Sequence, residues 1–109
     1  MHKDHDKFIS AIHGRRKMRV KFYSKEDQAI LTRICAPLDY GPSRRAKVKN
    51  NRYHFWDYTS DEKEHVLSLN PNQILEMEIL DETFDPAEFV TWDTRKNPWF
   101  VPRDWGPYS

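Results

Sequence analysis

The clearest chemical signal in the chain is a basic segment interleaved with aromatic side chains. Arg44, Arg45, Lys47 and Arg52 lie close together, and ring-bearing residues follow them from Tyr53 onwards. Positive side chains attract phosphate groups and rings stack on bases, so this combination is typical of a site for nucleic acid or a small anionic ligand. The alternative is a solvated basic edge that discourages strand pairing.

A second basic run covers residues 15–21, and both runs belong to an uneven charge distribution. Residues 1–56 carry fourteen Lys or Arg against five Asp or Glu, whereas residues 57–109 carry four against twelve. The two halves nearly cancel, to a net charge of +1. A basic face of this kind would attract phosphates or acidic partners. Alternatively, the two halves interleave in the fold and neutralise one another.

Several other chemistries are excluded or disfavoured by the residue types. Cys35 is the only cysteine, which excludes an intramolecular disulfide and a multi-cysteine zinc site and is typical of a reducing cytosol. Two histidines and two aspartates lie within residues 2–6, but we expect a frayed terminus that does not hold metal ligands in one geometry. Glu76 and Glu78 could form an acid–base pair only if an apolar surface raised the pKa of one carboxyl above that of the other, and the sequence around them offers no such surface. We therefore expect no catalytic residue, no metal and no cofactor.

The periodicity of the sequence predicts the short elements that must position these residues. Apolar residues at helical spacing after Asp4, the expected N-cap, predict a helix over residues 5–13 that ends at Gly14. Alternating or β-branched segments predict strands, and we expect Pro37 to end the second of them, before a turn over residues 39–43. The predicted strands cover residues 18–23, 30–36, 52–58, 65–69 and 75–79.

The predicted elements describe one small domain that is mainly β, a curled sheet or barrel of five or six strands. Residues 1–14 form its leading helix, residues 15–82 the barrel, and residues 83–109 a short helix and a proline-rich aromatic tail. With Trp92, Trp99 and Trp105, this tail is too aromatic to be solvated, so we expect it to pack over the barrel. Its alternatives are a ligand pocket or an interface. No apolar run is long enough to predict a membrane helix.

The order of several short motifs within residues 5–80 adds a family resemblance. These motifs are Val20-Lys21-Phe22-Tyr23, Arg33-Ile34-Cys35-Ala36-Pro37, Tyr53-His54-Phe55, Leu67-Ser68-Leu69 and Gln73-Ile74. Their order after a helix resembles that of WYL domains. The resemblance implies a small Sm-like or SH3-like β-barrel and a cytoplasmic module of bacterial transcription regulation. Such modules sense small ligands or nucleic-acid fragments and often contribute to dimerisation.

Tyr23 and Arg33 match the pattern of the family, so the resemblance implies that they belong to the ligand surface. At three other polar positions, His54, Ser68 and Gln73, this chain has different residues from those typical of the family. The first functional expectation is therefore a non-enzymatic regulatory binding module. The alternative is a protein-interaction or homodimerisation subunit that uses the aromatic tail or an open sheet edge. His54 also has a structural interpretation, with its ring nitrogens hydrogen-bonded inside the fold. The complete expected ligand or nucleic-acid site is Tyr23, Arg33, Arg44, Arg45, Lys47, Arg52 and His54.

Overall fold

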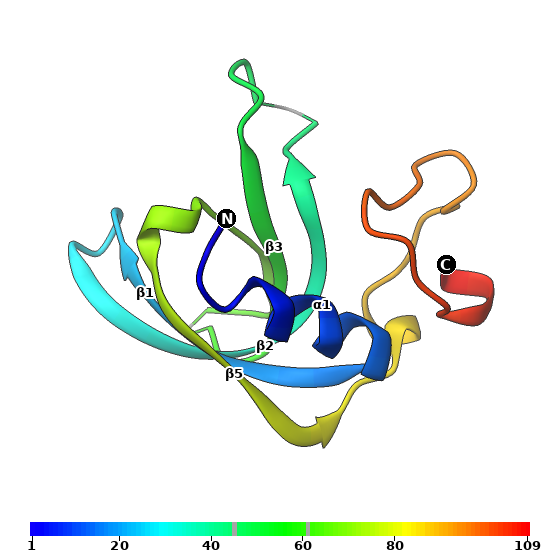
Figure 1. The fold of residues 1–109 in the computed structure, drawn as a ribbon, viewed down its shortest axis with the longest axis horizontal. Coiled ribbons are helices and arrows are strands. Elements are labelled where there is room, and N and C mark those ends of the chain that lie inside the picture. The colour runs from blue at the N-terminus through cyan, green and yellow to red at the C-terminus, as the bar shows by residue number, and fades with distance from the viewer. Residues whose placement is uncertain (45, 61) are drawn as a thin grey trace.

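The computed structural model describes residues 1–44, 46–60 and 62–109 (Figure 1). Within these residues, one α-helix precedes five strands, so the chain is mainly β as predicted. The helix is α1 (His5–Gly14), and short 3-10 turns cover Pro71–Gln73, Pro86–Glu88 and Gly106–Tyr108. The strands are β1 (Arg16–Ser24), β2 (Ala29–Pro42), β3 (Asn51–Asp57), β4 (His65–Leu69) and β5 (Ile74–Thr83).

The five strands form one antiparallel sheet in the order β4-β3-β2-β1-β5. The edges are β4 and β5, and no ladder of hydrogen bonds joins them in the described part of the chain. The predicted closed barrel is therefore wrong, because the sheet is curved but open (Figure 1). Helix α1 lies against this sheet and buries Phe8, Ala11 and Ile12 completely. The helix, rather than strand closure, thus completes the core.

The face of the sheet that carries Val20 and Phe55 lies towards α1 and is called the inner face here; the opposite one is the outer face. On the inner face, Phe8 of α1 meets Phe55 edge to face, with ring centroids 5.3 Å apart. On the outer face, Trp56 stacks on Phe89 of the tail at 5.8 Å. The strand β3 is therefore covered on both faces and internal, which explains why aromatic residues occupy both of its faces.

The strand β2 is longer than predicted, because Pro37 does not end it. The ladder with β3 shifts its register between Pro37 and Asp39, and pairing then continues to Pro42. Proline donates no backbone hydrogen bond, so within an internal strand it is tolerated at a bulge of this kind. The predicted turn over residues 39–43 is therefore wrong, because most of it belongs to the second half of β2.

Both ends of α1 differ in detail from the prediction. Asp4 is the N-cap residue as expected, but its side chain makes no capping hydrogen bond; instead its Oδ2 accepts a hydrogen bond of 3.0 Å from the backbone N–H of Met77 in β5. At the other end Gly14 is the last helical residue, and Arg15 adopts the left-handed conformation with φ 52°. The carboxylate of Asp4 therefore ties the start of α1 to an edge strand of the sheet.

The strand β5 forms as predicted, but its apolar residues are not all buried. Met77 is fully buried, whereas Leu75 and Ile79 are 38% and 37% exposed. The register with β1 shifts between Lys21 and Phe22, so the simple alternation breaks beside Leu75. As an edge strand, β5 also has one uncovered side, which leaves part of its apolar surface open.

The tail after β5 packs against β2, β3 and the end of α1 (Figure 1). The predicted short helix is a single 3-10 turn, and the side chain of Asp85 accepts from the backbone N–H of Ala87 there. Trp105 is 1% exposed, and its indole N–H donates to the carbonyl of Ile12 at 2.8 Å. The tail is therefore part of the core. No helix among the described residues has the length and apolar character needed to cross a bilayer.

Candidate functional site

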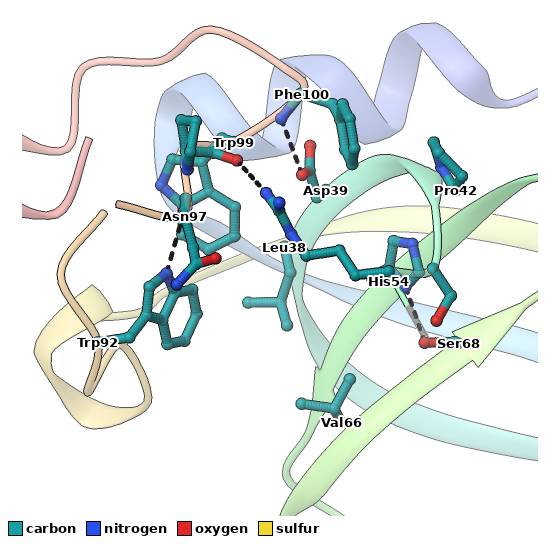
Figure 2. Close-up of a pocket in the computed structure, with 13 residues that line it drawn as sticks. Leu38, Asp39, Pro42, His54, Val66, Ser68, Trp92, Asn97, Trp99 and Phe100 are labelled. Carbon is teal, nitrogen blue, oxygen red and sulfur yellow. Dashed lines mark hydrogen bonds between the residues drawn. The ribbon is translucent and has the colours of Figure 1, made fainter. Parts of the chain in front are cut away.

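A cavity of about 370 Å³ lies between the outer face of the sheet and the tail (Figure 2). Its floor comes from β2, β3 and β4, and its wall comes from residues 92–100. Pockets of this size accommodate small organic ligands. The apolar lining includes Leu38, Val66, Trp92, Trp99 and Phe100, and the polar lining includes Asp39, Arg44, His54, Ser68 and Asn97.

The floor of the cavity contains a fully hydrogen-bonded histidine. His54 in β3 and Ser68 in β4 are register partners, and Nδ1 of His54 lies 2.7 Å from Oγ of Ser68 (Figure 2). Nε2 of His54 lies 2.9 Å from the carbonyl oxygen of Gly41 in β2. Because a carbonyl oxygen only accepts, Nε2 carries the proton in the neutral ring, and the Ser68 hydroxyl donates to Nδ1. The interpretation of His54 as a hydrogen-bonded histidine is therefore confirmed.

Three aromatic residues of the tail form the wall. The rings of Trp92 and Trp99 meet edge to face, with centroids 5.3 Å apart, and the indole N–H of Trp92 donates to the carbonyl of Asn97 at 3.3 Å. Phe100 is 49% exposed, and its ring lies so close to Gly41 that a Cβ atom there would collide with it. This wall offers ring faces and edges for contact with a flat ligand.

Asp39 and Arg103 hold the wall onto the sheet. The carboxylate of Asp39 accepts a hydrogen bond of 2.9 Å from the backbone N–H of Phe100 and pairs with Arg103 at 3.3 Å. The fully buried Arg103 side chain lies between the rings of Trp99 and Trp105, at 3.9 and 4.4 Å from their centroids. Burial lowers the pKa of Arg103 to about 10, against the opposing effect of Asp39, so the guanidinium is charged at neutral pH. The charge of Asp39 is thus balanced inside the fold.

Arg44 brings a further positive charge to the cavity. Its Nη2 donates to the carbonyl oxygen of Pro98 at 2.7 Å, and its guanidinium carbon lies 5.5 Å from the ring centroid of Phe100. Lys47 lies exposed in the same loop between β2 and β3, and Arg45 lies outside the described residues. Of the described residues in this loop, Arg44 is therefore the cation that lines the cavity.

The other expected site residues do not join this cavity. Arg52 lies on the outer face like His54, but it is not part of the lining, and its buried Nε has no hydrogen-bond partner among the described residues. Arg33 lies on the inner face, with its Nε 3.5 Å from the carboxylate of Asp57. Tyr23 lies on the outer face and is 42% exposed. The two residues that the family resemblance nominates therefore point to opposite faces of the sheet.

The remaining candidate groups are engaged within the fold. His2 and His5 are ordered, so the expected frayed terminus is wrong: Nε2 of His2 lies 2.8 Å from the carbonyl of Ile74, and Nδ1 of His5 lies 2.8 Å from the Tyr53 hydroxyl. The described residues contain no cluster of three groups suited to a metal ion. Cys35 is buried, and burial raises the pKa of its thiol, which disfavours the reactive thiolate.

Three residues that build this site, Ser68, Asp39 and Arg103, were not among those expected from the sequence. Ser68 could have been found from the strands over residues 52–58 and 65–69, because pairing them as a hairpin places Ser68 opposite His54 in one register. No local signal could have paired Asp39 with Arg103, because 64 residues separate them and their contact depends on how the tail docks.

Comparison with protein-family models, curated proteins and solved structures yields no match to this chain. The resemblance to WYL domains therefore stays a prediction that rests on the order of its motifs. The cavity and the charges around it are therefore the features of this chain that indicate a function.

Proposed function

We propose that this chain is a regulatory ligand-binding module, similar in role to WYL domains, whose cavity takes a small anionic ligand with a flat ring. A nucleotide, free or at the end of a single strand, has both of these groups. The proposed recognition needs no catalytic residue, metal or cofactor. As part of the same proposal, the module acts in the bacterial cytoplasm, in the regulation of transcription.

The observation that carries this proposal is a cation beside aromatic surfaces in one cavity. Arg44 lines the cavity together with Trp92 and Trp99, and all three side chains are held by contacts within the tail or to it. A guanidinium binds phosphate or carboxylate oxygens through several N–H groups at once, and an aromatic ring contributes about 1–3 kcal/mol by stacking on a base.

The electrostatics of the lining favour an anion over a cation. Asp39 is the one carboxylate among the described lining residues, and it is paired with the buried Arg103. Both ring nitrogens of His54 are engaged, by the Ser68 hydroxyl and by the carbonyl of Gly41. The guanidinium of Arg44 donates to an uncharged carbonyl, so its positive charge is the one that a ligand meets.

A titration followed by tryptophan fluorescence and by fluorescence anisotropy tests the proposal. The ligands are nucleoside monophosphates and short single-stranded and duplex oligonucleotides, each at two salt concentrations. We expect binding that weakens with salt, and Arg44→Ala should weaken it further and flatten the dependence on salt. Lys25→Ala is the matched control, because it removes one exposed positive charge in the turn between β1 and β2, away from the cavity.

The outcomes separate recognition from general attraction to positive charge. Equal losses in Arg44→Ala and Lys25→Ala would assign the binding to net charge and overturn the proposed site. No binding of any nucleotide or oligonucleotide at low salt would overturn the nucleotide-like ligand itself.

A second candidate function is homodimerisation or binding of a protein partner, favoured by the part of the outer face that carries exposed apolar residues. Tyr23 in β1 and Ile30 in β2 are register partners on this face, and they are 42% and 55% exposed. Adjacent exposed apolar side chains are typical of an interface. Sedimentation at increasing protein concentration should show a dimer that Tyr23→Glu dissociates; a monomer at all concentrations would reject the homodimer.

A further inference from the structure

The floor of the cavity holds a serine and a histidine in the arrangement of a nucleophile and its base. Oγ of Ser68 and Nδ1 of His54 are 2.7 Å apart, and both residues line the cavity. The hydroxyl proton of Ser68 points to Nδ1, because the proton of the neutral ring is on Nε2. Ser68 thus has its proton directed at a group that can accept it, which is the requirement for a serine nucleophile.

A third group fixes the histidine ring. Nε2 of His54 donates to the carbonyl oxygen of Gly41 at 2.9 Å, and all three residues belong to neighbouring strands of one sheet. The carbonyl selects the tautomer that leaves Nδ1 free to accept a proton, and it stabilises the Nε2–H of the imidazolium that forms afterwards. The backbone carbonyl of Gly41 therefore positions the imidazole ring of His54.

We propose that Ser68 is an acyl-accepting nucleophile with His54 as its general base, and that the cavity takes a small carboxylic ester that carries an anionic group. This activity goes beyond reversible binding in the same cavity and does not require the ligand to be a nucleotide. The guanidinium of Arg44 binds the anionic group of the ester, and the aromatic wall contacts its apolar part.

The reaction needs no reactant besides the ester and water. Oγ of Ser68 bonds to the ester carbonyl carbon while its proton moves to Nδ1 of His54. The carbon–oxygen bond to the leaving alcohol then breaks, and the alcohol takes that proton, which leaves an acyl group on Ser68. Water then attacks the acyl carbon while His54 accepts a proton from it. The bond between this carbon and Oγ of Ser68 breaks, Oγ takes the proton back from His54, and the carboxylic acid is released.

Two features of the site indicate a slow reaction. The orienting group is a neutral carbonyl rather than a carboxylate, so it stabilises the imidazolium less. Because Arg44 binds the anionic group of the ester, the side-chain amide of Asn97 in the lining is the donor left for the oxyanion of the tetrahedral intermediate, which is weaker than a pair of backbone N–H groups. An activated ester with a good leaving group is therefore the suitable probe.

The test uses the full chain with 4-acetoxy-3-nitrobenzoate, an activated aryl ester that carries a carboxylate, and with neutral 4-nitrophenyl acetate for comparison. Both reactions are followed by release of the nitrophenolate and by peptide mapping of the acetylated protein. We expect the acetyl group on Ser68 and its loss in Ser68→Ala. Removal of the base in His54→Gln should lower the acylation rate by about 10²–10⁴-fold. Ser10→Ala and His65→Gln are matched controls, because they remove an exposed serine of α1 and an exposed histidine of β4.

Mapping of the unaltered protein decides the question even where a variant fails to fold. Acetyl groups confined to lysines, or a rate that Ser68→Ala leaves unchanged, would overturn the inference. Equal rates in His54→Gln and the unaltered protein would also overturn it, because the base would have no part. Nucleotide binding without acylation would reject this inference alone, and acylation at Ser68 without nucleotide binding would reject the nucleotide-like ligand alone.

Discussion

Replacement of Asp39 by Asn should destabilise the protein strongly, because it leaves a buried guanidinium without its counter-charge. The Arg103 side chain is fully buried, and the Asp39 side chain is 11% exposed. Asn keeps one acceptor oxygen and replaces the other by an NH₂ group. The backbone N–H of Phe100 or Val101, each of which donates to Asp39 at 2.9 Å, then faces a donor instead of an acceptor.

The expected cost follows from the burial of the pair. Removing one partner of a buried ion pair costs about 3–5 kcal/mol, and a domain of this size has a total stability of about 5–15 kcal/mol. Each kcal/mol corresponds to about 4–8 °C in the melting temperature of a small domain. Asp39→Asn should therefore fold only marginally at 37 °C. The wall of the cavity should loosen first, because Phe100 and Arg103 both bind to Asp39.

Urea unfolding followed by tryptophan fluorescence and by circular dichroism measures this loss. The matched control is Asp93→Asn, which removes a carboxylate paired with Arg95, a side chain that is 90% exposed. Exposed ion pairs contribute about 0–1 kcal/mol, so this control should change the stability little.

A double-mutant cycle separates the ion pair from other losses. Arg103→Leu should also be strongly destabilising, and the double variant Asp39→Asn/Arg103→Leu should lose less than the sum of the single losses, with a coupling of about 0.5–3 kcal/mol. A loss below about 1 kcal/mol in Asp39→Asn, or strict additivity in the double variant, would refute the reasoning from burial.

Two further predictions concern the edge strand β5 and the cavity. Burial by itself would raise the pKa of Asp4, but the hydrogen bond from the Met77 N–H and the charge of Lys7 bring it below the ordinary value of 3.8. A carboxylate with a lowered folded pKa stabilises the fold above its unfolded pKa and loses this contribution as the pH falls through the folded pKa. Urea titrations below about pH 4 should therefore show a smaller loss of stability for Asp4→Asn than for the unaltered protein, and equal losses would contradict the role of Asp4. Gly41→Ala should displace the Phe100 ring, because the added Cβ would lie 2.5 Å from Cδ2 of that ring, and nucleotide binding should weaken by about 1–3 kcal/mol in a fluorescence titration. An unchanged Kd would show that Phe100 has no part in the ligand wall.

Local pattern was enough to predict most of the elements. The helical spacing of Phe8 and Ile12 predicted α1, and the alternation along residues 18–23 and 75–79 predicted β1 and β5. Each of these signals depends on near neighbours in the chain, because a helix or strand places residues two to four positions apart on one face. The packing of the tail over the sheet, with Trp105 buried, followed from its aromatic composition.

Pattern failed where a contact between distant segments decides the outcome. Pro37 reads as the end of a strand, yet a bulge against β3 carries β2 onward to Pro42. The succession of short predicted strands favoured a curled sheet or barrel, yet α1 completes the core and leaves β4 and β5 as open edges. Both results depend on which segment fills the space beside a strand, and no window of neighbouring residues contains that information.

The amino-acid sequence was enough to identify the charged and aromatic residues of the candidate site and most of the strands that carry them. It placed Arg44 and His54 among the expected ligand-binding residues, and the structure brings these two to one cavity. Tyr23 and Arg33 face opposite sides of the sheet, and Ser68 lies within hydrogen-bond distance of His54, because of how the strands pair. Strand register and the docking of the tail set these relations, because a shift by one residue exchanges the two faces of a strand.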